Sequence, residues 1–216
     1  MVIAITNLKG GVGKTTIATN LAVSFATRGK QVCIVDTDLG QQSSMEWSGN
    51  RDETLLRVPV FGVGIKQLNK EVEELKTKYD LVIIDGTPQL SELADRTIVA
   101  SDLLIIPLSP SIYDFRGFEN FLTRYEQIKG TKEAMGGKVE AYVILNRVVA
   151  NTNVSKEIID ALKEYDITLM KVKLVNRIAY VETATQGLGV VEYKDPKAKS
   201  EIVGLTNEVE KAFQNL

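Results

Sequence analysis

The chain has 216 residues, of which 44% are hydrophobic and 25% are charged, and its formal net charge is −2. This profile is typical of a globular protein that buries a sizeable core, and it excludes a disordered chain. The sequence has no histidine and one cysteine, Cys33, which we interpret as a core residue. These counts exclude intrachain disulfides, cysteine clusters for zinc or iron–sulfur, and histidine-dependent nucleophilic mechanisms.

The first half of the chain alternates apolar runs with segments of helical periodicity. In DLVIID (80–85) the apolar run is uninterrupted, which indicates a strand covered on both faces. A helix should begin at Lys14, and Gly29 is a suitable C-terminal stop. We predict strands at 2–6, 31–36, 58–61 and 80–85, and helices from Lys14 to Gly29 and over 65–79.

The second half of the chain repeats this alternation. The repeated order of strand and helix predicts an α/β fold, with a mostly parallel twisted sheet and helices on both faces. No linker or repeat is visible, so we expect residues 1–216 to form a single domain. The predicted elements are strands at 102–108, 139–148 and 167–175, and helices over 112–129, 154–165 and 198–214.

The N-terminal segment, MVIAITNLKGG, lacks the basic region, long apolar core and cleavage site of a signal peptide. Nowhere does an apolar run approach the roughly 18 residues of a membrane-spanning helix. We therefore expect a cytoplasmic protein with no membrane segment.

The stretch NLKGGVGKTT, residues 7–16, resembles the phosphate-binding pattern G-x-x-x-x-G-K-[ST]. Leu8 stands where the pattern has its first glycine, and a second lysine, Lys9, follows it. A predicted strand precedes this loop and a predicted helix follows it, as a phosphate loop requires. The fold is therefore expected to be that of a P-loop NTPase.

Each residue type in this loop has a chemical reason to be there. Gly10, Gly11 and Gly13 allow backbone N–H groups to turn inward around an anion, at the positive end of the following helix. Lys14 is placed to bridge the β- and γ-phosphates. The hydroxyl of Thr15 is placed to bind Mg²⁺, and that of Thr16 to reach the α-phosphate.

Aspartates follow two of the predicted strands at their carboxyl ends, where ligands bind in open α/β sheets. Asp85 ends the apolar run LVIID, as a Walker-B aspartate does. Asp36 and Asp38 close the sequence CIVDTD, two residues apart. A single aspartate in such a position could be a turn residue, but three beside a phosphate loop indicate a nucleotide triphosphate site.

The motifs KGGVGKTT, VDTD and LVIIDGTP together resemble the deviant Walker-A ATPases of the ParA/MinD family. The resemblance extends over essentially the whole chain and includes LSPSIYDFRG (108–117), VILNRV (143–148) and RIAYVETATQGLGVVEY (177–193). It implies an ATPase that uses ATP and Mg²⁺ and releases ADP and phosphate. It also implies a homodimer that closes face to face around two ATP molecules.

The resemblance assigns a role to each site residue. Lys9 would reach the phosphates of the ATP bound by the partner subunit, as an arginine finger in trans does. Asp38 would orient or activate the attacking water, Asp36 and Asp85 would hold Mg²⁺ through water, and Asn146 would contact the adenine. The complete set expected to bind nucleotide is Lys9, Gly10, Gly11, Val12, Gly13, Lys14, Thr15, Thr16 and Asn146.

Two short motifs depart from the family pattern. DGTP stands where the family often has D-x-P-P, and DTDLGQQ stands where many members have D-x-D-P-Q. Both changes flank the aspartates without replacing them, so the expected roles are unchanged.

The family divides by partner, and the sequence favours one branch. The last helix carries only Leu205, Val209 and Phe213 on its apolar face, which favours packing on the domain over a membrane-binding helix. The phosphate loop lies within ten residues of Met1, so we expect no helix-turn-helix region ahead of it. The leading hypothesis is a small ParA-type DNA-partition protein that is nucleoid-associated and acts with a small centromere-binding protein.

Two other hypotheses stay open. One is an ATPase that positions cargo or binds membranes in the manner of MinD, and the other is a metabolic ATP-dependent ligase. In the leading hypothesis the ATP-bound dimer binds DNA without sequence preference, which requires a local basic surface despite the acidic composition. The candidate DNA contacts are Lys171, Lys173, Arg177, Lys194, Lys197 and Lys199, each of which could also be a solvated surface residue.

Overall fold

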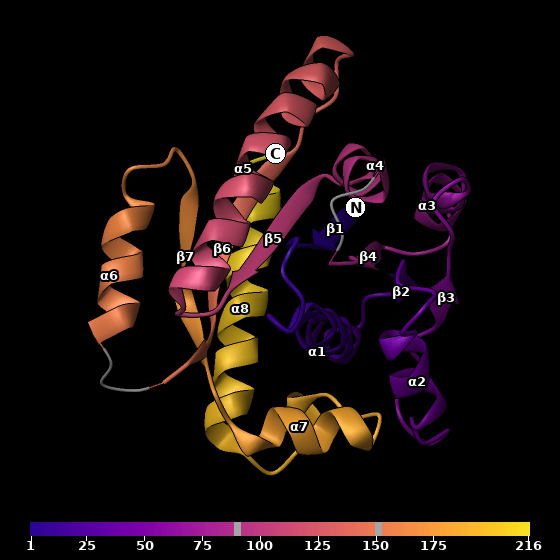
Figure 1. Cartoon of the computed structure of the whole chain (residues 1–216). Coiled ribbons are helices and arrows are strands. Elements are labelled where there is room, and N and C mark those ends of the chain that lie inside the picture. Colours follow the sequence, from indigo (N-terminus) through magenta and orange to yellow (C-terminus); the bar gives the residue numbers. More distant parts are fainter. Residues whose placement is uncertain (89–91, 150–152) are drawn as a thin grey trace.

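A computed structural model of the chain describes residues 1–88, 92–149 and 153–216. Its centre is a seven-stranded sheet in the order β3-β2-β4-β1-β5-β6-β7, and every neighbouring pair of strands is parallel (Figure 1). The predicted parallel α/β fold is therefore confirmed. The strands are β1 (Val2–Ile5), β2 (Val32–Asp36), β3 (Val60–Gly62), β4 (Leu81–Asp85), β5 (Leu103–Leu108), β6 (Glu140–Val148) and β7 (Thr168–Val175).

Helices cover both faces of this sheet, and each face has its own hydrophobic core. The core on one face is built with α1, α2, α7 and α8, and the core on the other with α3, α4, α5 and α6 (Figure 1). The helices are α1 (Lys14–Thr27), α2 (Ser43–Gly49), α3 (Leu68–Lys76), α4 (Glu92–Ala100), α5 (Ile112–Ala134), α6 (Asn153–Leu162), α7 (Ile178–Thr185) and α8 (Pro196–Gln214), with a short 3₁₀ turn, η1, at Val190–Glu192.

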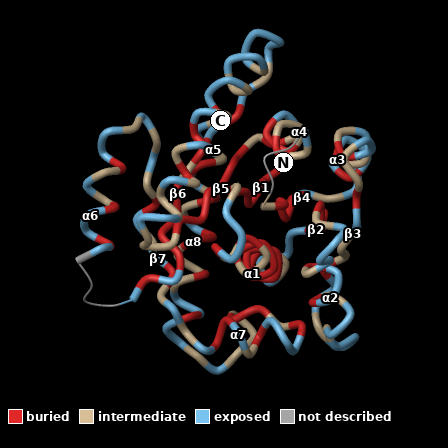
Figure 2. The backbone as a smooth tube through the Cα atoms, in the orientation of Figure 1, coloured by how far each residue is buried: buried red, intermediate tan, exposed pale blue. Residues whose placement is uncertain are grey.

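The central strands are apolar throughout because both of their faces are covered. In β1, Ile3 belongs to one core and Val2 to the other, and all four residues of the strand are buried. Figure 2 shows this buried centre, with α1 buried along most of its length. Cys33 is also buried in β2, as predicted, and burial raises the pKa of its thiol to about 12.

The predicted strands and long helices agree with the structure apart from their ends. β3 begins at Val60, two residues later than expected, because Val58 and Pro59 belong to the preceding loop. Three short helices, α2, α4 and α7, were not predicted. They have 7, 9 and 8 residues. The helix α3 also has 9 residues, but the apolar period that predicted it continues into the flanking segments, from Ile65 to Tyr79.

The C-terminal helix α8 packs on the domain, as predicted. Leu205 and Val209 are fully buried, and Phe213 packs against the same core. Beside this apolar face, the Glu208 carboxylate accepts the backbone N–H groups of Lys171 and Val172 on the edge strand β7. Within the part of the chain described here, no helix is both long and apolar enough to cross a membrane.

Candidate nucleotide-binding site

The loop between β1 and α1 is shaped by glycines at its tip. Gly11 and Gly13 have left-handed φ values of 76° and 93°, which glycine adopts without strain. Gly13 is the N-cap of α1, and a Cβ atom there would lie 2.2 Å from Nδ2 of Asn146. Both the backbone angle and the contact therefore require glycine, and the loop wraps tightly around the N-terminus of α1.

Lys14 lies beneath this loop. Its side chain crosses the loop, and Nζ donates a hydrogen bond to the carbonyl oxygen of Lys9 at 2.9 Å. Lys14 is only 7% exposed, and burial lowers the pKa of its ammonium to about 8, although the charges of Asp85 and Asp38 act in the opposite direction. The lysine is thus held at the phosphate pocket by the loop backbone, and the charges of two nearby carboxylates favour its protonated form.

Asp36 and Asp85 are directly opposite each other, because β2 and β4 pair in an unbroken register. Oδ2 of Asp85 accepts hydrogen bonds from the hydroxyls of Thr15 at 2.7 Å and Ser44 at 2.5 Å. Oδ2 of Asp36 accepts the backbone N–H of Ser44 at 3.0 Å. Ser44 therefore links the two carboxylates, a role that sequence reasoning missed because the serine lies in the unpredicted helix α2.

Burial controls the protonation of both carboxyls. It raises the pKa of Asp85 to about 6, although the hydroxyls of Ser44 and Thr15 partly offset this. Burial also raises the pKa of Asp36, while its backbone N–H donors act in the opposite direction. Among the described residues, Oδ1 of Asp85 is a buried oxygen that lacks a hydrogen-bond partner. An unpaired buried carboxylate oxygen is costly in free energy, so this atom is suited to a cation or to its bound water.

The site fits Mg²⁺ only together with phosphates. In the portion of the chain covered by the structure, no three acidic, cysteine or histidine side chains form a group that could hold a metal ion. Mg²⁺ usually keeps several waters and binds one or two carboxylates together with substrate phosphates. Asp85, Asp36 and the Thr15 hydroxyl oxygen supply such a partial set of ligands.

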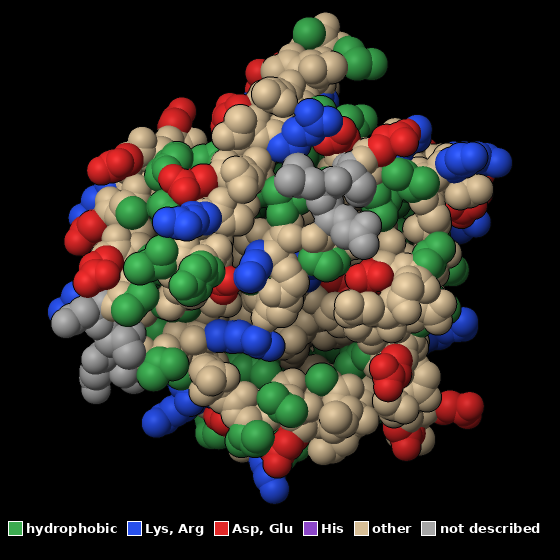
Figure 3. Space-filling view, in the orientation of Figure 1, with side chains coloured by type: hydrophobic (Ala, Val, Ile, Leu, Met, Phe, Trp, Pro, Cys, Tyr) green, Lys and Arg blue, Asp and Glu red, His purple; other side chains and the backbone are tan. Residues whose placement is uncertain are grey.

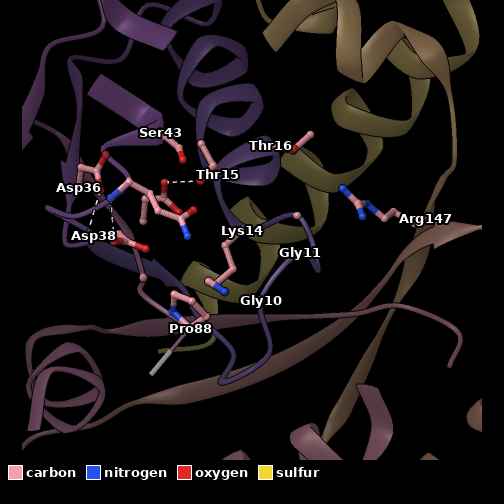
Figure 4. Close-up of a pocket in the computed structure, with 14 residues that line it drawn as sticks. Gly10, Gly11, Lys14, Thr15, Thr16, Asp36, Asp38, Ser43, Pro88 and Arg147 are labelled. Carbon is pink, nitrogen blue, oxygen red and sulfur yellow. Dashed lines mark hydrogen bonds between the residues drawn. The ribbon is translucent and has the colours of Figure 1, made fainter. Parts of the chain in front are cut away.

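The predicted phosphate residues line one pocket of about 220 Å³ at the carboxyl ends of the strands. Figure 4 shows Lys14 between the loop glycines and the aspartates, with Asp36 and Asp38 at one side. Asp38 is less buried than Asp36 and accepts the backbone N–H of Gln41 at 3.2 Å. The lining residues are Gly10, Gly11, Gly13, Lys14, Thr15, Thr16, Asp36, Asp38, Gln41, Ser43, Asp85, Gly86, Pro88 and Arg147.

The two lysines of the loop have different surroundings. Whereas Lys14 is buried, the side chain of Lys9 is 46% exposed, and its nearest acidic group is Asp114 on α5, 4.0 Å from Nζ. Lys9 is absent from the residues that line the phosphate pocket of its own subunit. The predicted role of Lys9 in the partner's site is not tested by a single chain and stays a prediction.

Asn146 lies under the phosphate loop, at the end of β6. Its Nδ2 donates to the carbonyl oxygen of Val12 at 2.7 Å, so it holds the loop backbone, a function that its sequence position does not reveal. Asn146 also lines a second pocket, of about 350 Å³, which shares Thr16 and Arg147 with the phosphate pocket. The predicted adenine contact of Asn146 stays a prediction, and this second pocket is the place where it would occur.

The candidate DNA contacts lie on β7, beside it and around the start of α8. Arg177 differs from the rest because its guanidinium donates two hydrogen bonds to Oε1 of Glu201, at 2.9 and 2.7 Å. This pairing makes Arg177 a less available phosphate ligand than the lysines. Lys171, Lys173, Lys194, Lys197 and Lys199 are all exposed.

A left-handed glycine loop at a helix N-terminus, a buried lysine beneath it and a paired strand-end aspartate define the class of P-loop nucleotide-binding proteins. Residues 3–190 match the family described as the CobQ/CobB/MinD/ParA nucleotide binding domain. The chain belongs to this family, so the predicted ParA/MinD-type assignment is confirmed.

Three similar proteins illustrate the breadth of this family. The chain is 27% identical to the sporulation initiation inhibitor protein Soj of Bacillus subtilis, over 92% of both chains. It is 25% identical to the maintenance of carboxysome distribution protein A of Halothiobacillus neapolitanus, over 96% of this chain and 95% of that protein. The septum site-determining protein MinD of Pyrococcus horikoshii, solved with Mg-ADP, shares the fold with a TM-score of 0.76 at 22% identity, over 98% of this chain and 96% of that one.

Proposed function

We propose that the protein is an ATPase that segregates DNA, and that its ATP-bound form is a dimer that binds DNA without sequence preference. The observation that carries this proposal is the contrast between the two loop lysines. Lys14 is buried in the pocket of its own subunit and bonds to the loop backbone, whereas Lys9 is exposed beside the pocket. A second cation in that position can serve a phosphate group that another subunit presents.

ATP would bind with its phosphates in the pocket around Lys14. The loop N–H groups and the positive end of α1 favour the phosphates, and Thr15 and Asp85 would hold Mg²⁺. The metal, when bound, neutralises charge on the β- and γ-phosphates. Oδ1 of Asn146 is an acceptor for the 6-amino group of adenine, which favours adenine over guanine in the second pocket.

Hydrolysis would use Asp38 as the base. It lies at the phosphate pocket and is less buried than the metal-binding pair, so water can reach it. The water oxygen attacks the γ-phosphorus, the bond to the β–γ bridging oxygen breaks, and Asp38 accepts the proton from the water. Lys9 of the partner subunit would stabilise the charge that develops on the transferred group.

The apolar side chains on the site face support dimerisation around the nucleotide. Several large hydrophobic residues are exposed after the strands at their carboxyl ends, where an ordinary monomer surface would favour polar groups. Figure 3 shows hydrophobic side chains around the central hollow of this face. The exposed residues that follow these strands are Leu39, Met45, Ile112, Tyr113, Val149, Ile178 and Val181.

The similarity to the chromosome-partitioning ATPase Soj of Thermus thermophilus and the exposed lysines near α8 support DNA as the ligand of the dimer. The apolar face of α8 is buried in the core, which leaves this helix without a surface for lipid. The partner that stimulates hydrolysis would be a small centromere-binding protein, and the ATPase would be associated with the nucleoid in the cytoplasm.

The proposal is tested by comparing wild type with Lys9→Ala, using Lys66→Ala as a control that removes an exposed lysine elsewhere. Light scattering should find a dimer of wild type and of Lys66→Ala with Mg-ATP, and a monomer with ADP. Lys9→Ala should bind ATP but stay monomeric, and duplex DNA should shift only with the ATP-bound dimer. If Lys9→Ala dimerises and hydrolyses ATP like wild type, the proposed role of Lys9 is wrong.

A second candidate is supported by the similarity to the carboxysome distribution protein along almost the whole chain. In that case the same ATP-dependent dimer would position a protein assembly. The DNA assay would then give the same result, but hydrolysis would respond to a cargo adaptor and not to a centromere-bound protein. ATP-dependent sedimentation with liposomes would instead indicate a membrane positioner.

A further inference from the structure

Arg147 occupies a backbone position that arginine rarely takes. Its φ is 55°, in the left-handed region, where side chains other than those of Gly, Asn and Asp are disfavoured. Strained residues of this kind are concentrated at ligand sites, because the surrounding structure must hold them in place. The strained backbone at Arg147 therefore indicates that its side chain has a role at a ligand site.

A β-bulge in strand β6 provides this conformation. Leu145 faces Lys173 and Val148 faces Val175 on β7, so three steps along β6 match two steps along β7. In a regular strand, consecutive side chains point to opposite faces of the sheet. Here Asn146 and Arg147 both line the second pocket, so the bulge turns two neighbouring side chains to the same site.

The Arg147 side chain lies where the two pockets meet. It lines both the phosphate pocket and the second pocket, and Thr16 is the other residue that the two have in common. Figure 4 shows the guanidinium directed from the end of β6 toward the loop, on the side of Thr16 and Gly11. In the described part of the chain, the guanidinium of Arg147 takes part in no ion pair, and its side chain is exposed.

A nucleotide whose β- and γ-phosphates lie at Lys14 and whose base lies in the second pocket must pass this junction with its α-phosphate. We propose that Arg147 is a nucleotide-positioning residue, and that its guanidinium binds the α-phosphate of the nucleotide in its own subunit, opposite the Thr16 hydroxyl. This inference rests on the proposed function. An unpaired guanidinium is suited to the task because it presents several N–H donors in a fixed plane that matches phosphate oxygens.

The proposal predicts that changing Arg147 lowers nucleotide affinity without lowering folding stability. Arg147→Gly removes the guanidinium and also relieves the left-handed backbone, so the ligand-free protein should unfold at the same or a higher temperature. Its affinity for Mg-ADP should nevertheless fall about tenfold to a hundredfold, the range for losing charge-assisted hydrogen bonds to phosphate. Arg147→Lys keeps the charge but loses the planar set of donors, so its affinity should lie between those of Arg147→Gly and wild type.

Calorimetric titration of the monomer with Mg-ADP measures these affinities, and thermal unfolding without nucleotide measures stability. Lys138→Ala, which removes a positive charge at the other end of β6, is the matched control and should bind like wild type. If wild type binds Mg-ADP and Arg147→Gly binds it equally well, the inference is wrong while the proposed function stands. Unchanged ADP affinity with loss of the ATP-dependent dimer would place Arg147 at the partner and overturn it equally. Failure of wild type to bind Mg-ADP would reject the proposed function itself.

Discussion

The two halves of the sheet differ in regularity, and the difference corresponds to what each half supplies. On one side, β4 pairs with β2 and β1 without a break, and this register sets Asp36 opposite Asp85. On the other side, β6 and β7 are shifted twice relative to each other. The regular half holds buried carboxylates at fixed positions, whereas the irregular half turns Asn146 and Arg147 toward one pocket. We infer that the regular half performs the chemistry and the irregular half recognises the nucleotide and DNA.

The largest expected effect would come from removing Asp38, which follows the regular strand β2. Asp38→Ala should lower the ATPase rate by about a hundredfold to ten-thousandfold, the usual contribution of a positioned base. ATP-dependent dimerisation and DNA binding should remain, because Asp38 neither bonds to the phosphate loop nor belongs to the expected Mg²⁺ ligands. Phosphate-release assays measure the rate, with the exposed Asp166→Ala as control. An unchanged rate in Asp38→Ala would remove this residue from catalysis.

The regular half should also determine the pH dependence of nucleotide binding. Burial raises the pKa of Asp85 to about 6 and lowers that of Lys14 to about 8, and binding needs both groups charged. Mg-ADP affinity should therefore be highest between these values and fall on either side by about tenfold per pH unit. Titration calorimetry across this range measures it. Asp85→Asn should lower affinity throughout and reduce the acid limb to the part that comes from protonation of the ADP phosphate, whose pKa is about 6. A flat profile between pH 5 and 9 would contradict the assigned charges.

The contribution of Asp85 to folding stability has the opposite sign. Its pKa is raised in the folded protein, so the fold binds the proton more tightly than the unfolded chain does. The stabilisation from this group is complete below the unfolded pKa and is lost as pH rises through about 6. Without nucleotide, the difference in melting temperature between Asp85→Asn and wild type should thus grow in favour of the variant across that range.

The irregular half and the start of α8 should govern DNA binding. Changing Lys194, Lys197 and Lys199 together to glutamine should weaken binding of the ATP-bound dimer about tenfold and flatten its salt dependence, equally for all sequences. ATPase activity without DNA should be unaffected, because none of the three residues lines the phosphate pocket. Fluorescence anisotropy at several salt concentrations is the measurement. A loss confined to particular DNA sequences would contradict non-specific phosphate contact.

The smallest expected effect concerns Ser44. Its hydroxyl lowers the pKa of Asp85, so Ser44→Ala should move the acid limb of Mg-ADP binding to higher pH and leave the basic limb in place. Ser43→Ala, the neighbouring change, removes a hydroxyl that lines the pocket without bonding to Asp85 and should leave the acid limb where it is. If the acid limb lies at the same pH in both variants, the Ser44 hydrogen bond does not control the pKa of Asp85.

Local sequence patterns predicted the regular half well. Uninterrupted apolar strands, a glycine loop and strand-end aspartates each carry a pattern within a few residues, so Lys14, Thr15, Asp36 and Asp85 could be placed before the fold was known. Ser44 could not, because its contact with Asp85 spans 41 residues and depends on the short helix α2.

The features of the irregular half could hardly be predicted from local sequence patterns. The bulge in β6 depends on how β7 pairs with it, which the sequence of β6 alone does not determine. No residue in VILNRV indicates that Arg147 has a left-handed backbone. The family resemblance predicts an adenine contact for Asn146. Its hydrogen bond to Val12 joins residues 134 positions apart, so no local sequence pattern could predict it. The ion pair of Arg177 with Glu201 likewise depends on the packing of α8 against β7.

Mixing two inactive variants tests most directly whether Lys9 of one subunit completes the catalytic site of the other. Lys9→Ala and Asp38→Ala should each be inactive alone. When they are mixed with Mg-ATP, mixed dimers should form, and each has one site with an intact Asp38 facing an intact Lys9. The ATPase rate of each mixed dimer should recover to about half that of the wild-type dimer, because one of its two sites is complete. If no activity returns although mixed dimers form, Lys9 acts within its own subunit and does not complete the partner's site.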